Sequence, residues 1–309
     1  MPPPADSAAV LFPGALGDFI CFLPTLFALR DRHGGRFLLV AKAELLDLVE
    51  FPKLTTASID RREISDLFRV GSDLAPETKA LFSGYDSIYS WTGFGNADVA
   101  RRLAAASGGR VHMCHARGML PGEHAVDYYA RSVGCRHRAM PAAAIRQDQG
   151  WLATMTLTSP ALVLHAGSGS ASKNWQGFDE ITQHWRAHHE YTIVHLVGPA
   201  ESHVGPQAAG VITAAGLSLP QVAALLHPSA LYLGNDSGIS HLAGAVGARG
   251  VVLFGPSDPT TWAPRSERLR IMHAPTPCMQ CPGAFCVHRL PVASVVAALE
   301  AQRSLLVQP

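Results

Sequence analysis

The stretch ALYLGNDSGISHLAGAVGARGVVLF (230–254) contains two apolar runs, ALYL (230–233) and VVLF (251–254), separated by a polar turn and a segment of small residues. Both apolar runs are continuous, as in strands of a parallel sheet that is covered on both faces. The turn holds residues that favour the start of a helix, and the small residues would let that helix pack closely on its neighbours. The stretch therefore predicts a strand–helix–strand unit with chemically active side chains in its turn.

The same alternation of apolar runs and helical segments extends along the chain. Strands are predicted at AAVLF (8–12), RFLLVA (36–41), DSIYSW (86–91), GRVHMC (109–114), ALVLHA (161–166), YTIVHLVG (191–198), SALYLG (229–234) and RGVVLFG (249–255). Helices are predicted after the turn PGALGD (13–18), at HAVDYYARSVG (124–134) and at 291–306. This order is typical of βα units, which form mainly parallel sheets.

The length of the chain favours two domains, because 309 residues exceed the usual size of one domain. A strand-poor region from about Ala139 to Thr158 is the best candidate for a linker. We therefore predict an α/β protein with two Rossmann-like domains whose parallel sheets face a central cleft. Residues 1–155 would form the first domain and residues 156–309 the second.

Composition argues against several classes of protein. The net charge of +1 is too small for nonspecific binding of nucleic acid, which needs a strong excess of basic residues. No apolar run approaches the roughly 20 residues of a membrane-spanning helix, and MPPPADSAAV (1–10) lacks the basic region of a signal peptide. We expect a soluble, cytoplasmic protein whose contact with membranes is at most peripheral.

The loop HAGSGSASKNW (165–175) follows a predicted strand and is a candidate anion site. Ser168, Gly169 and Ser170 would let the backbone approach a phosphate closely, and Lys173 could add a positive charge. The spacing matches neither the P-loop nor the dinucleotide fingerprint, which argues against both of those functions. A Gly/Ser loop of this kind is also compatible with an ordinary turn.

The loop GNDSGISH (234–241) is the second candidate site. Asp236 or Ser237 is a natural N-cap, so the amides of Ser237, Gly238 and Ile239 would lack helical partners and could bind an anion. Because Asp236 would repel a phosphate, its carboxylate is better suited to sugar hydroxyls. His241 could donate to a phosphate or a hydroxyl, or it could be a buried structural histidine.

The loop PGALGD (13–18) is the third candidate site. Gly14 and Gly17 permit tight backbone geometry after the first strand, and Asp18 is either a helix cap or a catalytic carboxylate. No two aspartates in the chain are separated by a single residue, so the D-x-D pair that often holds a divalent metal is missing. Neutralisation of a diphosphate would have to come from Lys173 and a helix end.

A cluster of soft ligands lies near the C-terminus, in CMQCPGAFCVH (278–288). Cys278, Cys281, Cys286 and His288 could together hold a structural zinc or iron ion, although the spacing is cramped. Free thiols in a loop are the alternative. No other cofactor is suggested.

The chain resembles glycosyltransferase family 9, the lipopolysaccharide heptosyltransferases and their relatives. The resemblance rests on GALGD (14–18), HAGSGSASKNW (165–175), GPAE (198–201), GNDSGISHLAGA (234–245) and FGPSDPTTW (254–262), which occur in the family's order. It implies a GT-B fold and an inverting, metal-independent transfer of a sugar. The donor would be a nucleotide-diphosphate sugar, usually ADP-heptose, and the acceptor a hydroxyl of lipopolysaccharide core or another glycan or glycolipid.

The resemblance also implies roles for single residues. Asp18 would be the general base. The diphosphate would meet Lys173, the 168–170 loop and the amides around Ser237–Ile239. Glu201 would reach the ribose of the nucleotide, and Asp236 and His241 would contact the donor sugar.

Two alternative functions remain open from the residues alone. One is a nucleotide-sugar epimerase or hydrolase of the same fold, and another is a noncatalytic nucleotide-sugar binding protein. The arginines of the first half are compatible with contacts to an acidic acceptor and equally with a solvated surface; they are Arg61, Arg62, Arg101, Arg102, Arg110 and Arg117.

Overall fold

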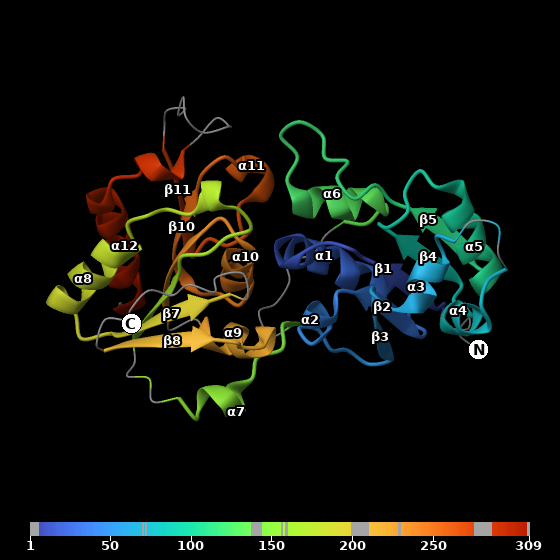
Figure 1. The fold of residues 1–309 in the computed structure, drawn as a ribbon, viewed down its shortest axis with the longest axis horizontal. Coiled ribbons are helices and arrows are strands. Elements are labelled where there is room, and N and C mark those ends of the chain that lie inside the picture. Colours follow the sequence, from blue (N-terminus) through green and yellow to red (C-terminus); the bar gives the residue numbers. More distant parts are fainter. Residues whose placement is uncertain are drawn as a thin grey trace. The chain divides into compact units, whose positions relative to one another are not determined.

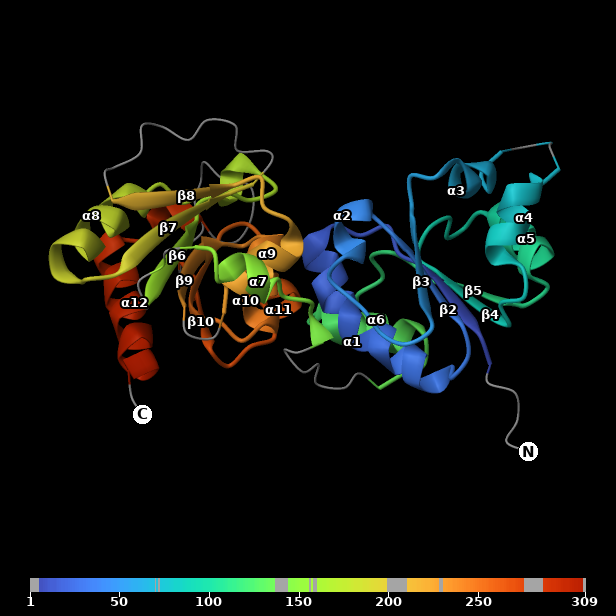
Figure 2. The same cartoon turned by 90° about the horizontal axis from the view of Figure 1, so that it is seen from below.

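The computed structural model describes residues 6–69, 71, 73–136, 144–155, 157, 160–198, 210–227, 230–274 and 286–307. The chain divides into two compact units, Met1–Met140 (unit 1) and Pro141–Pro309 (unit 2). Each unit is an α/β layer structure around its own parallel sheet (Figures 1 and 2). No described helix has the length and apolar character that crossing a membrane requires.

Unit 1 is built on a five-stranded sheet in the order β3-β2-β1-β4-β5, and every neighbouring pair is parallel. The strands are β1 (Ala8–Leu11), β2 (Phe37–Ala41), β3 (Leu54–Ser58), β4 (Ser87–Ser90) and β5 (Arg110–Met113). The side chains of β1, β2 and β4 are buried throughout, which explains their continuous apolar sequences. The strand order reverses between β1 and β4.

Helices cover both faces of this sheet. They are α1 (Leu16–Arg32), α2 (Ala43–Leu46), α3 (Arg62–Asp66), α4 (Pro76–Phe82), α5 (Ala97–Ser107) and α6 (Ala125–Ser132). One core cluster joins the sheet to α3, α4 and α5 through Ile64, Phe82 and Leu103. The helices α1 and α6 contact each other and lie on the opposite face of the sheet (Figure 2).

Unit 2 is built on a six-stranded sheet in the order β11-β10-β9-β6-β7-β8, again with every pair parallel. The strands are β6 (Ala161–His165), β7 (Thr192–Val197), β8 (Val211–Ala215), β9 (Leu231–Asn235), β10 (Arg249–Phe254) and β11 (Leu269–His273). Here the order reverses between β6 and β9.

The helices of unit 2 also form two layers. They are α7 (Gln149–Leu152), the 3-10 helix η2 (Ala171–Lys173), α8 (Phe178–His188), α9 (Leu219–Leu225), α10 (Gly238–Ala245), α11 (Pro259–Trp262), the 3-10 helix η3 (Val287–Arg289) and α12 (Val292–Val307). Trp185 of α8 and Leu299 of α12 belong to one buried cluster with β6, β9 and β10, so these two helices share a face. The helices α9 and α10 lie on the other face (Figure 2).

All eight predicted strands are present, and three further strands were not predicted. These are β3, β8 and β11, which lie at sheet edges. Their residues alternate irregularly between exposed and buried, so their sequences contain no continuous apolar run. An edge strand has a neighbour on one side only, and its sequence signal is weaker for that reason.

Candidate functional site

The loops predicted from the sequence lie where the strand order of each sheet reverses. In unit 1 the loop 12–18 follows β1, and Trp91 follows β4, its neighbour across the reversal. In unit 2 the loop 166–175 follows β6, and Asp236 follows β9. Open parallel sheets bind ligands beyond the carboxyl ends of their strands at this switch point, because the two loops there diverge to opposite faces. Each unit thus holds one candidate site.

The candidate site of unit 1 is a pocket of about 240 Å³. It is lined by Phe12, Pro13, Gly14, Ala15, Asp18, Trp91, Ala116, Arg117 and Tyr129. The rings of Phe12, Trp91 and Tyr129 contact one another edge-on, with centroids 5.4–6.4 Å apart. Asp18 is therefore a partly buried carboxylate beside an aromatic wall.

Asp18 is placed by the start of α1. The N-cap of this helix is Ala15, without a side-chain hydrogen bond, so the prediction that Asp18 could cap the helix is wrong. Asp18 instead lies in the first turn, where the positive end of the helix stabilises a carboxylate. A Cβ at Gly14 would overlap the ring of Phe12 and lie 2.7 Å from the Cβ of Asp18, so this position has room for glycine alone. Gly17 lies inside the first turn of the same helix.

Tyr129 of α6 is the polar neighbour of Asp18. Its hydroxyl donates to Asp18 Oδ1 at 3.4 Å. Burial raises the pKa of Tyr129, and the negative charge of Asp18 raises it further. The phenol therefore stays protonated and can keep donating to the carboxylate. A long hydrogen bond of this kind leaves lone pairs of Asp18 available to a ligand.

The candidate site of unit 2 is held together by Asn235, the last residue of β9. Its side-chain amide donates to the carbonyl of Ala166 at 2.6 Å and accepts from the backbone N–H of Trp175 at 3.2 Å. Asn235 is fully buried. One side chain thus fixes both ends of the loop that follows β6 to the strand β9.

Lys173 and Asp236 form an ion pair, with Lys173 Nζ 2.7 Å from Asp236 Oδ2. Asp236 is almost fully buried, whereas the Lys173 side chain is 28% exposed. The carboxylate therefore holds the ammonium group at the surface of the loop. A buried carboxylate needs such a partner, because an unpaired buried charge is costly.

Ser237 is the N-cap of α10, and it is one of the two residues predicted for that position. Its hydroxyl accepts from the N–H of Ser240 at 3.4 Å and lies 3.3 Å from His165 Nδ1. Gly238 and Ile239 begin the helix, so their N–H groups have no carbonyl four residues earlier within it. His241 is buried in the first turns of the helix.

The Gly/Ser loop after β6 is shaped by its own side chains. Ser168 Oγ lies 2.7 Å from the carbonyl of Ser170 and 2.6 Å from Asn174 Oδ1. Ser170 Oγ lies 2.9 Å from Ser172 Oγ. A Cβ at Gly169 would meet nothing within 4 Å, so the backbone is open to a ligand there.

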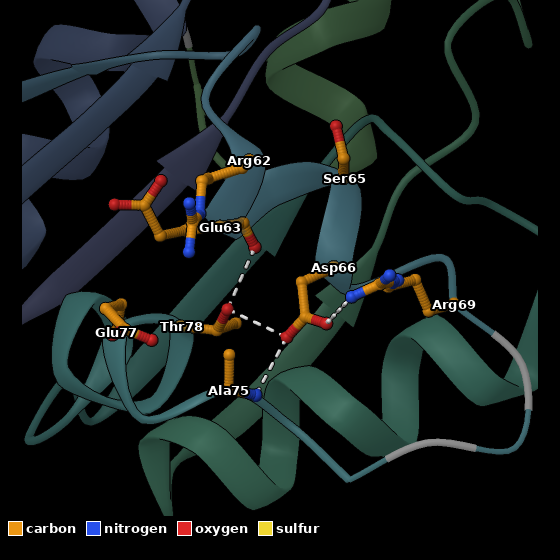
Figure 3. A pocket seen from close by; sticks show the side chains of 8 residues that line it. All are labelled: Arg62, Glu63, Ser65, Asp66, Arg69, Ala75, Glu77 and Thr78. Carbon is orange, nitrogen blue, oxygen red and sulfur yellow. Dashed lines mark hydrogen bonds and ion pairs between the residues drawn. The ribbon is translucent and has the colours of Figure 1, made fainter.

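A larger pocket in unit 1, of about 440 Å³, lies between α3 and α4 (Figure 3). Its central carboxylate, Asp66, accepts from Ala75 N at 3.0 Å and from Thr78 Oγ1 at 2.8 Å. The hydrogen bond from Ala75, and then that from Thr78 and the nearby arginines, hold the pKa of Asp66 below its usual value against the opposing effect of burial. Asp66 therefore joins the two helices, and we favour the smaller pocket as the site of chemistry.

Some predicted residues lie outside the described residues: Glu201, Cys278 and Cys281. Of the other two members of the cysteine cluster, Cys286 is buried and His288 is exposed. Sequence reasoning missed Tyr129 and Asn235. Asn235 lies within GNDSGISH (234–241), at the end of a buried apolar run. This position in the sequence could have identified it as a site residue. Tyr129 lies in an apolar helical pattern that gives no sign of its contact with Asp18.

Comparison with known proteins was made by sequence and by structure. The profile of glycosyltransferase family 9 (heptosyltransferase) matches residues 120–289, which is more than half of the chain. A search of curated protein sequences finds no match.

Three solved structures have the same arrangement of sheets. A family 9 glycosyl transferase from Veillonella parvula is 18% identical, with a TM-score of 0.71 over 96% of this chain and 97% of that one. The E. coli ADP-heptose LPS heptosyltransferase II is 17% identical, with a TM-score of 0.71 over 97% and 99% of the two chains. The E. coli heptosyltransferase WaaC, solved with ADP, is 19% identical, with a TM-score of 0.66 over 96% and 99%.

At these identities the structures establish the fold, and the predicted α/β architecture with two parallel sheets, the GT-B fold, is confirmed. The family itself follows from the sequence profile. The chain belongs to glycosyltransferase family 9 and is a heptosyltransferase-like glycosyltransferase.

Proposed function

We propose that this protein transfers a heptose from ADP-heptose to a hydroxyl group of a glycan acceptor, such as lipopolysaccharide core, with inversion at the anomeric carbon. The observation that carries the proposal is the pair of switch-point sites. One holds a carboxylate that accepts a long hydrogen bond from Tyr129, and the other holds an anchored lysine beside the start of a helix. The WaaC structure, which contains ADP, supports the choice of donor.

We assign donor binding to unit 2. Lys173 would meet the diphosphate together with the N–H groups of Gly238 and Ile239, since cations and helix starts both attract phosphate. Asp236 would anchor Lys173 and accept from sugar hydroxyls with its remaining lone pairs. His241 is assigned to the same sugar. Glu201, outside the described residues, stays the predicted partner of the ribose.

We assign acceptor binding and proton transfer to unit 1. Asp18 would remove the proton of the acceptor hydroxyl as its oxygen forms a bond to the anomeric carbon. The bond from that carbon to the diphosphate breaks, and ADP leaves with the electron pair. No divalent ion enters this scheme, because Lys173 and the helix start supply the positive charge at the leaving group.

An anionic acceptor is favoured by the place of one arginine. Arg117 lines the pocket of Asp18 and is exposed. Three other arginines of the unit are already in ion pairs with acidic side chains: Arg61 with Glu63, Arg101 with Asp98 and Arg102 with Asp66. Arg117 can therefore attract a phosphate or carboxylate of the acceptor toward the base.

Thermal unfolding with ADP, UDP, GDP and CDP tests the donor, because a nucleotide that binds the folded state raises its stability. We expect the largest increase in Tm with ADP, and equal shifts with all four would contradict an adenine-specific donor site. ADP release from ADP-heptose then tests the reaction. Release that requires a glycan acceptor supports a transferase, whereas release without acceptor would support a hydrolase.

A further inference from the structure

Three side chains with metal-binding atoms meet at the end of α8, and none of them belongs to either candidate site. His184 and His189 come from α8 and its C-cap, and Glu300 comes from α12. One ligand atom from each residue lies within 4.8 Å of the other two. His189 Nε2 is 2.5 Å from Glu300 Oε1, and His184 Nε2 is 3.7 Å from the same oxygen.

We propose that these three residues form a binding site for a divalent transition metal of the zinc class. Two imidazole nitrogens and one carboxylate oxygen are a ligand set that zinc accepts, with water at the fourth position. Metal–ligand bonds of about 2.0–2.1 Å in a tetrahedron place ligand atoms about 3.3 Å apart. The two observed separations, 2.5 and 3.7 Å, lie on either side of this value. Small rotations of the side chains would therefore admit an ion.

Neighbouring groups hold the three ligands in place. The ring of His189 lies over Trp185 with centroids 4.5 Å apart, and the ring of His184 stacks on His188 at 4.3 Å. Arg303 Nε donates to Glu300 Oε2 at 2.8 Å, which fixes the carboxylate and leaves Oε1 directed at the histidines. Outer partners of this kind orient metal ligands and raise the affinity of a site.

The electrostatic surroundings favour a cation on balance. The site lies at the C-terminus of α8, where the free carbonyl groups form the negative end of the helix. Arg303 opposes a second positive charge, but it neutralises the carboxylate oxygen that faces away from the histidines. The side chains of His184, His189 and Glu300 are 30%, 14% and 29% exposed, so an ion from solution can reach them.

The position of the site gives it a structural role. The helix α8 is 11 residues long, so its C-terminus lies about 16 Å from its start near the loop of Lys173. An ion there would cross-link α8 to α12, the two helices that cover one face of the unit 2 sheet. The inference does not rest on the proposed transferase reaction, because it involves none of the residues assigned to it.

Zinc titration of the full-length, untagged protein tests the site after treatment with a chelator and dialysis. The Cys278→Ser/Cys281→Ser variant serves as background, because the predicted cysteine cluster then keeps only two of its four ligands. In calorimetry we expect one Zn²⁺ site, and at least about 100-fold weaker binding in His184→Gln, since losing a direct ligand costs at least as much as losing an outer partner. His188→Gln is the matched control, and it should weaken Zn²⁺ binding far less than His184→Gln does, because it removes a stacking neighbour and no ligand atom.

A second measurement keeps the test independent of folding defects. Co²⁺ added to the same background should give the visible absorption of a tetrahedral nitrogen and oxygen site without a thiolate charge-transfer band, and His189→Gln should lose it. Zn²⁺ should raise Tm in the background but not in His184→Gln. Equal Zn²⁺ affinity in His184→Gln and His188→Gln would overturn the proposal, and so would the loss of all binding in the Cys278→Ser/Cys281→Ser background.

Discussion

The two switch-point sites differ in the kinds of side chain that surround their charged residues. In unit 1 the carboxylate of Asp18 stands against aromatic rings and accepts a long hydrogen bond from Tyr129. In unit 2 the polar side chains bind one another, with Lys173 paired to Asp236 and Asn235 bonded to both ends of the loop that follows β6. The first arrangement leaves a reactive group available, while the second fixes charges and amides in advance. The difference suggests that proton transfer belongs to unit 1 and diphosphate binding to unit 2.

Asp18→Asn tests whether the carboxylate of unit 1 performs chemistry. We expect kcat to fall by about 10²–10⁴, because a positioned general base contributes that much to a rate. The affinity for ADP should stay within about twofold, a difference well below the tenfold change that 1.4 kcal/mol produces. Steady-state kinetics and calorimetry measure the two quantities.

Tyr129→Phe is the matched control for that experiment, since it keeps the ring and removes the hydroxyl that donates to Asp18. At 3.4 Å the hydrogen bond to the Asp18 carboxylate is long and weak, so its loss should contribute no more than about 1.5 kcal/mol and kcat should fall by about tenfold or less. Full turnover by Asp18→Asn would remove Asp18 from the reaction and erase the contrast between the two units.

Lys173→Ala tests the assignment of the diphosphate to unit 2. The loss of one charge-assisted hydrogen bond, about 1.5–3 kcal/mol, should weaken ADP binding by about 10–150-fold. Calorimetry with ADP measures the change, and Lys79→Ala, at an exposed lysine of α4 in unit 1, is the control. Unchanged affinity would mean that the ion pair with Asp236 is purely structural.

Asp66→Asn tests whether the other carboxylate of unit 1 serves the fold alone. The folded-state pKa of Asp66 is lowered, so its contribution to stability is present above the unfolded pKa, near pH 4, and is lost as the pH falls through the folded pKa. We expect the variant to be less stable by about 1–3 kcal/mol at neutral pH. The difference in free energy of unfolding between Asp66→Asn and the unmodified protein should become smaller in acid. At neutral pH the kcat of the variant should be unchanged.

Urea unfolding at neutral and acidic pH measures this difference. Asp60→Asn, at an exposed aspartate of the same unit, should show no such narrowing. A large loss of kcat in Asp66→Asn would instead move the chemistry toward the pocket between α3 and α4.

Sequence patterns predicted the interior of each sheet better than its edges. Strands such as β1 and β9 are buried on both faces, and burial imposes a continuous apolar run that can be read directly. The edge strands β3, β8 and β11 were not predicted, because part of their surface faces solvent and can carry polar residues. The prediction of two parallel sheets did not depend on them.

The candidate loops were predictable because the residues that form them are contiguous. Ser237 and its helix follow from capping chemistry, which acts over a few residues. The contacts of Tyr129 with Asp18 and of Lys173 with Asp236 join residues 111 and 63 positions apart. No local pattern encodes such pairs, so the charge on Lys173 was predicted without its partner. Asp18 was placed in the right turn, but of its two predicted roles the capping position belongs to Ala15.

The reversal of strand order has a consequence for how the chain acquires its sites. The strands that meet at each reversal are far apart in sequence, with Ala8 opposite Ser87 and Leu162 opposite Leu231. Closing such long loops carries an entropic cost that pairing of nearer strands avoids. During synthesis, the Asp18 pocket can assemble once α6 has emerged. The lysine loop must wait for β9, so the proposed catalytic site can form before the proposed nucleotide site.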